Sequence, residues 1–311
     1  MSGARPFWLP AAPFLFLCLW SGGFGFGKLG LGHAGPYTFL CVRYAIVVAV
    51  LALAALYFRP AWPNRIMSIV HLTVVGLCIQ AGYFGFTYTA LAGGAAAGSV
   101  ALITSLQPIL VALIAPKLTG ESVGLRQWLG LILGLTGAAI VILSRHGAQA
   151  EQPLMMLFAF GALASMTAAT VYEKRFGGQA HPIAANLVQA VAGFIALLPL
   201  AWLIDDFAFD LHRDTLIALS YLVIGNSVIA ISLLLTMIRY GEVARVSAWF
   251  FMVPPVAALI AFGVIGETLA PMAWLGMAVA AIGVALVVRQ GSTGPAKPAR
   301  AKPATAKEPA A

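Results

Sequence analysis

The sequence predicts an all-α membrane protein whose ten transmembrane helices form two inverted repeats of five. Three observations lead to this prediction: the composition is strongly apolar, ten apolar runs have membrane-spanning length, and the two halves of the chain match each other. Of the 311 residues, 61% are hydrophobic and only 9% are charged, whereas a soluble domain has about 25% charged residues. Most of this chain is therefore expected to lie in lipid.

The ten apolar runs are each long enough to cross a hydrocarbon core of about 30 Å. The first run follows Arg5 and lacks a clean small-residue cleavage site, so we expect a retained helix there and not a cleaved signal peptide. The loops between the runs are short. In order, the runs cover residues 11–29, 37–58, 68–90, 95–115, 127–144, 153–172, 183–204, 215–238, 243–265 and 271–289.

These runs divide the chain into four parts. Residues 1–10 are expected to form a cytoplasmic N-terminus. The first five-helix repeat covers residues 11–144 and the second, inverted repeat covers residues 153–289. Residues 290–311 are rich in Pro, Ala and Lys and cannot bury a core, so a disordered cytoplasmic tail is expected.

Lysine and arginine residues predict the orientation, because cytoplasmic loops of membrane proteins are enriched in both. With the N-terminus inside the cell, fourteen of them face the cytoplasm and three, Lys28, Arg145 and Arg213, face outward. The sequence thus predicts a multi-pass protein of the bacterial inner membrane with both termini cytoplasmic. The excess of lysine and arginine over acidic residues is explained by this orientation in the membrane, so no nucleic-acid partner is expected.

The second half of the chain repeats the first. A shift of 147 residues places Pro108 on Pro255, and a shift of 146 places Trp128 on Trp274. Five helices are an odd number, so the second copy enters the membrane from the opposite side. Inverted repeats are typical of secondary transporters, whose substrate site lies near the midplane where the repeats meet.

Residues of the first half form a pattern that consists of Trp20–Gly23, Arg43, Pro108, Gly120-Glu121 and a glycine-rich fifth helix. With the matching residues of the second half, the pattern resembles the EamA-type branch of the drug/metabolite transporter (DMT) superfamily, and within it the aromatic amino acid exporters of the YddG kind. The resemblance implies ten helices, inverted repeats and export of small metabolites. One departure is Met166, which takes the place of Trp20 in the second repeat.

The expected function is a secondary transporter that exports small amphipathic metabolites, amino acids and preferably aromatic ones, by alternating access. A drug or quaternary ammonium exporter of the same superfamily is the alternative, because aromatic rings can bind cations. A passive channel is a third class, which saturable uptake would exclude. The expected partners are the small-molecule substrate and the lipid bilayer, and the chain is expected to be a monomer.

An enzyme is not expected, and neither is a cofactor or a metal. The five histidines are scattered near helix ends or in loops, and the three cysteines lack metal-ligand spacing. The stretch SGGFGFGKLG, residues 21–30, resembles a phosphate-binding loop. It has Leu29 where such a loop needs the Ser or Thr that holds Mg²⁺, so a nucleotide site is not expected.

Polar and aromatic residues recur at helical spacing in the predicted first, third and fourth helices, and the repeat shift gives their partners in the second half. Ligand pockets are mostly apolar and aromatic, with a few polar groups. We therefore expect these residues to line the substrate site, and ordinary packing between helices is the alternative for each. They are Trp20, Phe24, Arg43, Gln80, Tyr83, Phe84, Thr87, Thr104, Ser105, Met166, Asn226, Ser227, Phe251 and Met252.

Arg43 is the charge placed deepest in the predicted membrane. Two roles are open: its side chain extends to the outer interface or pairs with a helix-end carbonyl, or it binds a carboxylate of the substrate. No Asp or Glu lies in the middle of a predicted helix. Because buried carboxylates are the usual proton relays, weak or absent proton coupling is expected.

Prolines and glycines mark two further features. Pro108, Pro254 and Pro255 fall inside predicted helices, where they would act either as static kinks or as a symmetric pair of hinges. Matched glycines in the predicted fifth and tenth helices, such as Gly137 and Gly283, favour close packing of these two helices within one chain. Dimerisation through the same faces is the alternative.

Overall fold

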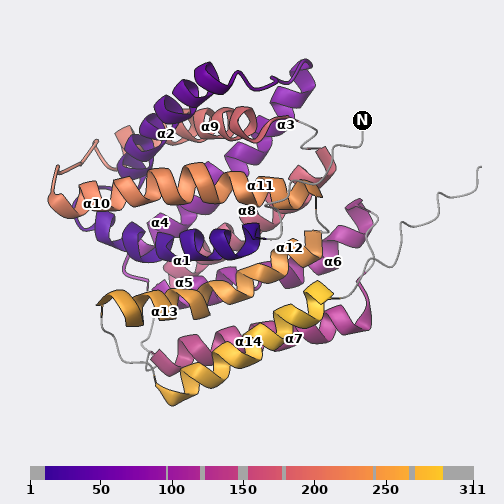
Figure 1. Cartoon of the computed structure of the whole chain (residues 1–311). Helices are drawn as coiled ribbons and strands as arrows, with labels where there is room; N and C mark the ends of the chain where they lie inside the picture. The colour runs from indigo at the N-terminus through magenta and orange to yellow at the C-terminus, as the bar shows by residue number, and fades with distance from the viewer. Residues whose placement is uncertain are drawn as a thin grey trace, which may run out of the picture.

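The computed structural model of the chain is a bundle of helices (Figure 1). The structure describes residues 11–95, 97–119, 123–145, 153–176, 180–240, 243–265 and 270–289. Within these ranges every regular element is a helix, apart from one isolated bridge between Ala34 and Phe209. The all-α fold is therefore confirmed. The predicted terminal segments 1–10 and 290–311, and Gly120-Glu121, lie outside the described residues.

Many of the helices are long enough to cross a membrane. Seven helices of the described chain, counted through their internal π-helical segments, have the length and hydropathy of membrane spans. Shorter apolar helices at Gln107–Leu118, Leu125–Val141 and Val246–Ala257 overlap the other predicted runs. The membrane-protein fold is supported, and the count of ten spans stays a prediction.

Proline starts several of the long helices, because its fixed φ and missing N–H suit the first helical turn. The helices α2, α8, α9 and α14 all begin at a proline. The helices of the first half are α1 (Ala12–Leu31), α2 (Pro36–Phe58), α3 (Ile66–Gly76), α4 (Phe84–Ala92), α5 (Ala97–Thr104), α6 (Gln107–Thr119) and α7 (Leu125–Arg145). Those of the second half are α8 (Pro153–Phe176), α9 (Pro182–Leu203), α10 (Arg213–Tyr221), α11 (Ile231–Tyr240), α12 (Val243–Ala248), α13 (Val253–Ile265) and α14 (Pro271–Arg289).

Two π-helical segments interrupt the halves at matching places. The segment η1 (Leu77–Tyr83) joins α3 to α4, and η2 (Leu222–Ala230) joins α10 to α11. Shifted by 146 residues, η1 would cover residues 223–229, which lie inside η2. Segments of π-helix inside α-helices are rare and occur frequently at functional sites.

The predicted fourth and ninth helices are also interrupted, which corrects the expectation that the prolines lie inside continuous helices. A turn at residues 105–106 separates α5 from α6, and the 3₁₀ segment η3 (Trp249–Met252) separates α12 from α13. Pro108 therefore lies in the first turn of α6, and Pro254 and Pro255 lie in the first turn of α13. The first turn of a helix tolerates proline, because an N–H there has no partner within that helix.

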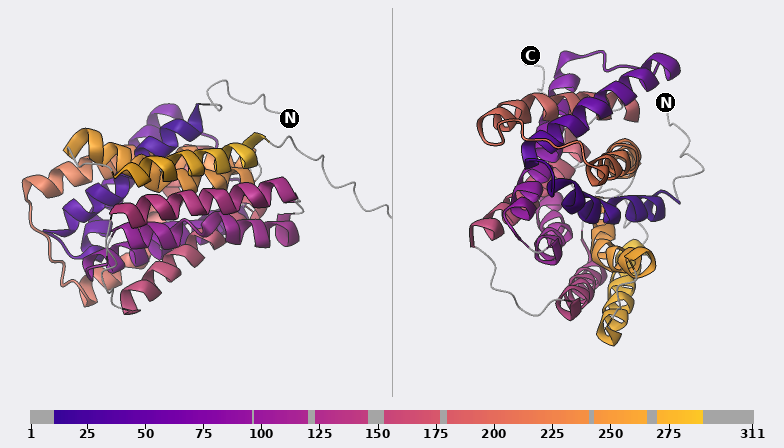
Figure 2. Two further views of the ribbon diagram at one scale, coloured as in Figure 1. Left: turned by 90° about the horizontal axis from the view of Figure 1, so that it is seen from below. Right: turned by 90° about the vertical axis from the view of Figure 1, so that its left-hand side faces the viewer.

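The helices α7 and α14 lie side by side (Figures 1 and 2). A Cβ atom added at Gly137 would lie 2.2 Å from the backbone nitrogen of Ala280, and one at Gly283 would lie 2.3 Å from that of Gly134. Only glycine allows the two backbones to approach so closely. The predicted packing of these helices within one chain is confirmed.

The two halves also pack on each other through their other helices. The first helix, α1, lies against α10 and η2, while α8 lies against η1 and α4. Small residues make both contacts close: a Cβ at Gly23 would meet the Asn226 amide at 2.8 Å, and a Cβ at Gly82 would meet Ser165 Oγ at 2.6 Å. The residues of α1 and η2 that face each other form the site described next.

Candidate functional site

A narrow cavity lies between α1, α4 and η2. Its water-accessible space is about 10 Å³, room for roughly one water molecule. Because usual ligand pockets measure about 300–1,000 Å³, the walls must move apart before a solute can enter. Trp20 is the ninth of the 20 residues of α1, so the cavity lies close to the middle of that helix. Its lining consists of Trp20, Gly23, Phe24, Tyr83, Phe84, Thr87, Tyr88, Leu91 and Asn226.

Aromatic rings form one wall of the cavity. The indole of Trp20 is 2% exposed and stacks on Tyr83, with centroids 5.9 Å apart and an interplanar angle of 26°. Phe84 lies 5.8 Å from Trp20 on the same side, and Phe250 meets the indole edge-on at 5.7 Å. Each such pair is worth about 0.5–1.5 kcal/mol beyond the area it buries, so the wall is a rigid, apolar surface.

Arg43 lies directly behind this wall and is fully buried. Its Nε donates to Ser227 Oγ at 2.8 Å, its Nη1 to the Tyr88 hydroxyl at 3.1 Å, and its Nη2 to Asn226 Oδ1 at 2.7 Å. The guanidinium also lies over the ring of Phe84, 4.4 Å from its centroid. Three of these partners, Tyr88, Asn226 and Phe84, line the cavity.

The charge of Arg43 has no acidic partner in the described part of the chain. Its three hydrogen-bond acceptors are two hydroxyl groups and an amide, all neutral. Burial and these bonds show that the side chain does not extend to the interface, which was one of the two expected roles. A positive charge at the back of the cavity, uncompensated by the described residues, attracts negative groups within it.

Thr87 adds a free polar group to the cavity. Its side chain is 3% exposed, and its Oγ1 has no hydrogen-bond partner among the described residues. Most buried polar atoms of folded proteins are hydrogen-bonded. A hydroxyl left unpaired on a cavity wall can bind a ligand or a water molecule.

Six of the residues predicted to line the site do line this cavity, namely Trp20, Phe24, Tyr83, Phe84, Thr87 and Asn226. Two others, Arg43 and Ser227, lie behind the wall and bond to each other. The remaining six lie elsewhere: Gln80, Thr104, Ser105, Met166, Phe251 and Met252.

Each displaced residue has a local reason for its position. Thr104 bonds to the carbonyls of Val100 and Ala101 in its own helix, and Ser105 is buried in the turn that follows. Met166 and Met252 pack in the hydrophobic core around Trp20 without reaching the cavity.

Gln80 is displaced by the π-helical segment in which it lies. The i→i+5 bonding of a π-helix adds a residue to the turn, so a face counted in α-helical steps does not continue through η1. The side chain is fully buried against α9, where a Cβ added at Gly193 would lie 2.3 Å from Gln80 Cβ. Neither amide atom of Gln80 has a hydrogen-bond partner in the described chain.

Phe251 does not face the cavity as the sequence predicted. Phe251 is fully buried near α7 and α14, where a Cβ at Gly134 would lie 2.6 Å from its ring. Its neighbour Phe250 points to Trp20 and Phe16 instead. The 3₁₀ segment η3 turns more tightly than an α-helix and rotates the side chains away from the predicted face.

The sequence reasoning missed Gly23, Tyr88 and Leu91 in the cavity lining. A signal for two of them was present, because Tyr88 and Leu91 follow Phe84 by four and seven residues and so lie on its face in α4. Gly23 gives no such signal. It lies in the lining because Asn226 of the other half approaches its backbone.

One acidic residue is also more deeply buried than its place near a helix end suggested. Glu173 is 1% exposed, and its Oε1 accepts from Arg239 Nε at 2.7 Å. The same arginine donates to the carbonyl of Ala180. This pair joins α8 to α11, away from the cavity lining.

Comparisons with known proteins agree with this architecture. A family model described as the EamA-like transporter family matches residues 9–143 and again residues 153–289. The chain is 26% identical over 294 residues to the uncharacterized inner membrane transporter YedA of Escherichia coli K12, covering 92% of each chain. It is 25% identical over 244 residues to the uncharacterized transporter YvbV of Bacillus subtilis, covering 76% of this chain and 77% of the relative.

A solved crystal structure has the same fold, with a TM-score of 0.75, 19% sequence identity, and coverage of 89% of this chain and 95% of the other. The relatives are transporters by name, which agrees with the expectation that this chain is not an enzyme. The two matches of the family model together cover most of the chain. The chain therefore belongs to the EamA-like transporter family.

Proposed function

We propose that the chain is a monomeric secondary transporter of the bacterial inner membrane that exports small amphipathic metabolites by alternating access. Amino acids are the substrate class, and aromatic ones are preferred, as in exporters of the YddG kind. One observation carries this proposal: an aromatic cavity between the two halves is backed by the buried cation Arg43, whose partners are all neutral.

The proposed architecture has ten spans in two inverted five-helix repeats, with both termini in the cytoplasm. The matching positions of η1 and η2 support it, and so does the double match of the family model. In transporters with inverted repeats, helices are discontinuous where they form the substrate site. Asn226 and Ser227 lie in η2, and the cavity residue Tyr83 ends η1.

The charge of Arg43 favours a substrate with a carboxylate over a cation. Two unit charges about 8 Å apart interact by roughly 2 kcal/mol at an effective dielectric constant near 20. A quaternary ammonium ion in the cavity would gain about 0.5–2 kcal/mol from the aromatic rings and lose a similar amount to Arg43. An aromatic amino acid would gain from the aromatic rings and from Arg43, because its ring would stack on Trp20 and its carboxylate would face the guanidinium.

The breaks at Pro108 and at Pro254-Pro255 serve as hinges in this proposal. Each proline lies in the first turn of the second part of an interrupted helix, so the two parts can change their relative angle without breaking a hydrogen bond at the proline. Pro255→Ala adds an N–H that would stiffen the break by bonding to a carbonyl of the preceding segment η3. The variant should slow transport several-fold and leave equilibrium binding of the substrate unchanged; weakened binding would argue against a hinge.

Counterflow in liposomes tests the substrate class directly. Purified protein would be loaded with unlabelled solute and assayed with labelled phenylalanine, phenylalanine amide and a quaternary amine. Saturable counterflow of phenylalanine is expected, with weak counterflow of the other two. Arg43→Gln should lower the phenylalanine rate at least 10-fold and the amide rate much less. Equal losses for acid and amide would contradict the carboxylate role, and faster counterflow of the amine would favour the drug-exporter alternative.

A further inference from the structure

Two loops from different halves of the chain are joined at one end of the bundle. The loop between α1 and α2 pairs with the loop between α9 and α10 through the bridge of Ala34 with Phe209. Gly35 N donates to Ala208 O at 2.9 Å, and Asp210 N donates to His33 O at 2.8 Å. These backbone bonds fix the residues that flank them.

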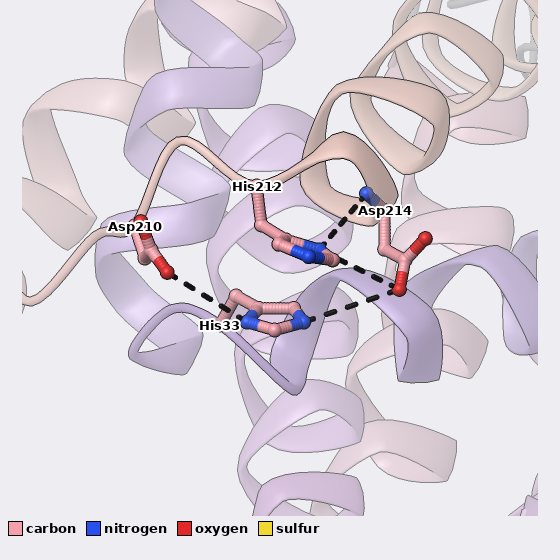
Figure 3. A network of polar contacts seen from close by, with 4 residues as sticks. All are labelled: His33, Asp210, His212 and Asp214. Atoms are coloured by element: carbon pink, nitrogen blue, oxygen red, sulfur yellow. Dashed lines mark hydrogen bonds and ion pairs between the residues drawn. The ribbon is translucent and has the colours of Figure 1, made fainter.

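Four titratable side chains meet at this junction (Figure 3). His33 lies between two carboxylates: its Nδ1 is 3.9 Å from Asp210 Oδ2, and its Nε2 is 4.0 Å from Asp214 Oδ2. His212 Nδ1 is 3.6 Å from the same Asp214 oxygen. The two imidazole rings stack with centroids 4.1 Å apart. Residues separated by 179 positions in the sequence thus form one cluster.

The cluster has the ligand set of a transition-metal site. The ligand atoms of His33, His212 and Asp214 all lie within 4.8 Å of one another. Two ligands on a tetrahedral Zn²⁺ ion are about 3.4 Å apart, given bonds near 2.1 Å. Nδ1 of His212 already accepts a hydrogen bond from Asp214 N, so Nε2 of His212 is the nitrogen that is available to an ion. The pair His33 Nε2–Asp214 Oδ2, at 4.0 Å, must shorten by about 0.6 Å.

The surroundings of the cluster suit such an ion. All three side chains are partly exposed, at 32% for His33, 47% for His212 and 40% for Asp214, so an ion can enter from solvent. Asp210, beside Nδ1 of His33, is placed to orient that ring, as carboxylates commonly do for metal-bound histidines. The nearest basic residue in the sequence, Arg213, is exposed. Imidazole nitrogens favour Zn²⁺, Co²⁺ and Ni²⁺ over Ca²⁺ and Mg²⁺, which prefer oxygen.

We propose that His33, His212 and Asp214 bind one divalent transition-metal ion of the Zn²⁺ class, which links the α1–α2 loop of one half to the α9–α10 loop of the other. This proposal departs from the expectation of no metal, which was based on histidines that are scattered along the sequence: His33 and His212 lie in different halves and meet only in the fold. This site is separate from the cavity, and its existence does not depend on the proposed substrate.

Metal titration of the full chain tests the proposal. The protein would be purified with a tag free of histidine, stripped with a chelator, and titrated with Zn²⁺ and Co²⁺ by calorimetry and by Co²⁺ absorption. One equivalent of each should bind, and His33→Ala, His212→Ala and Asp214→Asn should each weaken binding at least 10-fold. Ca²⁺ and Mg²⁺ should not compete.

His181→Ala is the matched control, because His181 also caps a helix and its Nδ1 accepts from Ile183 N at 3.3 Å, as His212 Nδ1 does from Asp214 N. This variant should bind Zn²⁺ like the wild type. Saturating Zn²⁺ should also raise the melting temperature of wild type and His181→Ala by several degrees, and not that of His33→Ala. No saturable binding, binding that survives in a His33→Ala/His212→Ala variant, or preference for Ca²⁺ would overturn the proposal.

Discussion

Arg43 Nη2 donates a 2.7 Å hydrogen bond to Asn226 Oδ1 and thereby joins α2 of one half to the π-helical segment η2 of the other. Nε of the same arginine bonds to Ser227, the next residue of η2. In lipid, a buried guanidinium depends on such partners because no water replaces them. The arginine therefore holds the cavity wall in place as well as supplying its charge.

The first prediction measures this contact. A double-mutant cycle of Arg43→Met and Asn226→Ala should give a coupling energy of about 1.5–3 kcal/mol, the range for hydrogen bonds to charged groups. Unfolding in mixed micelles would supply the free energies. Gln107, which bonds to Thr170 and Ser247 and shares no partner with Arg43, is the control. Arg43→Met with Gln107→Ala should be additive to within about 0.5 kcal/mol, and similar coupling in both cycles would contradict a specific contact.

The second prediction separates two neighbouring rings. Phe250→Ala removes the edge-on contact with Trp20 and should raise the KM for an aromatic substrate about 2–13-fold, which corresponds to the 0.5–1.5 kcal/mol of an aromatic pair. Phe251→Ala opens a void beside Gly134 and should lower the free energy of unfolding by about 3–5 kcal/mol with KM unchanged. Transport kinetics and thermal unfolding of both variants check this. If Phe251→Ala raised KM and Phe250→Ala lowered only the stability, Phe251 would line the site, as the sequence predicted.

The sequence was sufficient for the parts of the fold that depend on local composition and on repetition. The apolar runs lie in helical parts of the described chain, several of them divided into two or three elements, and the glycines of α7 and α14 do meet. Within the site, Trp20 and Phe24 of α1 line the cavity together, and so do Phe84 and Thr87 of α4, as helical spacing predicts. Thr104 of α5 and Met166 of α8 also lie in regular helix but do not reach the cavity.

What could not be predicted depends on local changes of helix type and on contacts distant in sequence. Gln80 lies in π-helix and Phe251 in 3₁₀-helix, and each change of type rotates the side chains that a count in α-helical steps would align. Arg43 and Asn226 were both selected as polar groups in lipid, but nothing local links them across 183 residues. The same holds for His33 and His212, whose loops meet only in the folded chain.

The third prediction concerns the contact of α7 with α14. Gly137→Ala would place a Cβ atom 2.2 Å from Ala280 N, so the helices must separate and the variant should lose about 2–4 kcal/mol of stability. Gly25→Ala is the control, because no atom lies within 4 Å of the Cβ it would add. That variant should be neutral or more stable by up to about 1 kcal/mol, since alanine favours a helix over glycine. Thermal unfolding would measure both, and equal losses would contradict the packing.

The last prediction concerns the buried ion pair of Glu173 with Arg239. Both Nε and Nη2 of the arginine lie 2.7 Å from Glu173 Oε1, and the carboxylate is fully enclosed. Removing one member of such a pair leaves a buried charge alone, so Glu173→Met or Arg239→Met should each lower the free energy of unfolding by about 3–5 kcal/mol. The double variant Glu173→Met/Arg239→Met removes both charges and should lose clearly less than either single variant. Unfolding of the three variants at one pH measures these differences. If the double variant lost as much stability as the two single variants together, the two charges would act separately, and the pair would not hold α8 to α11.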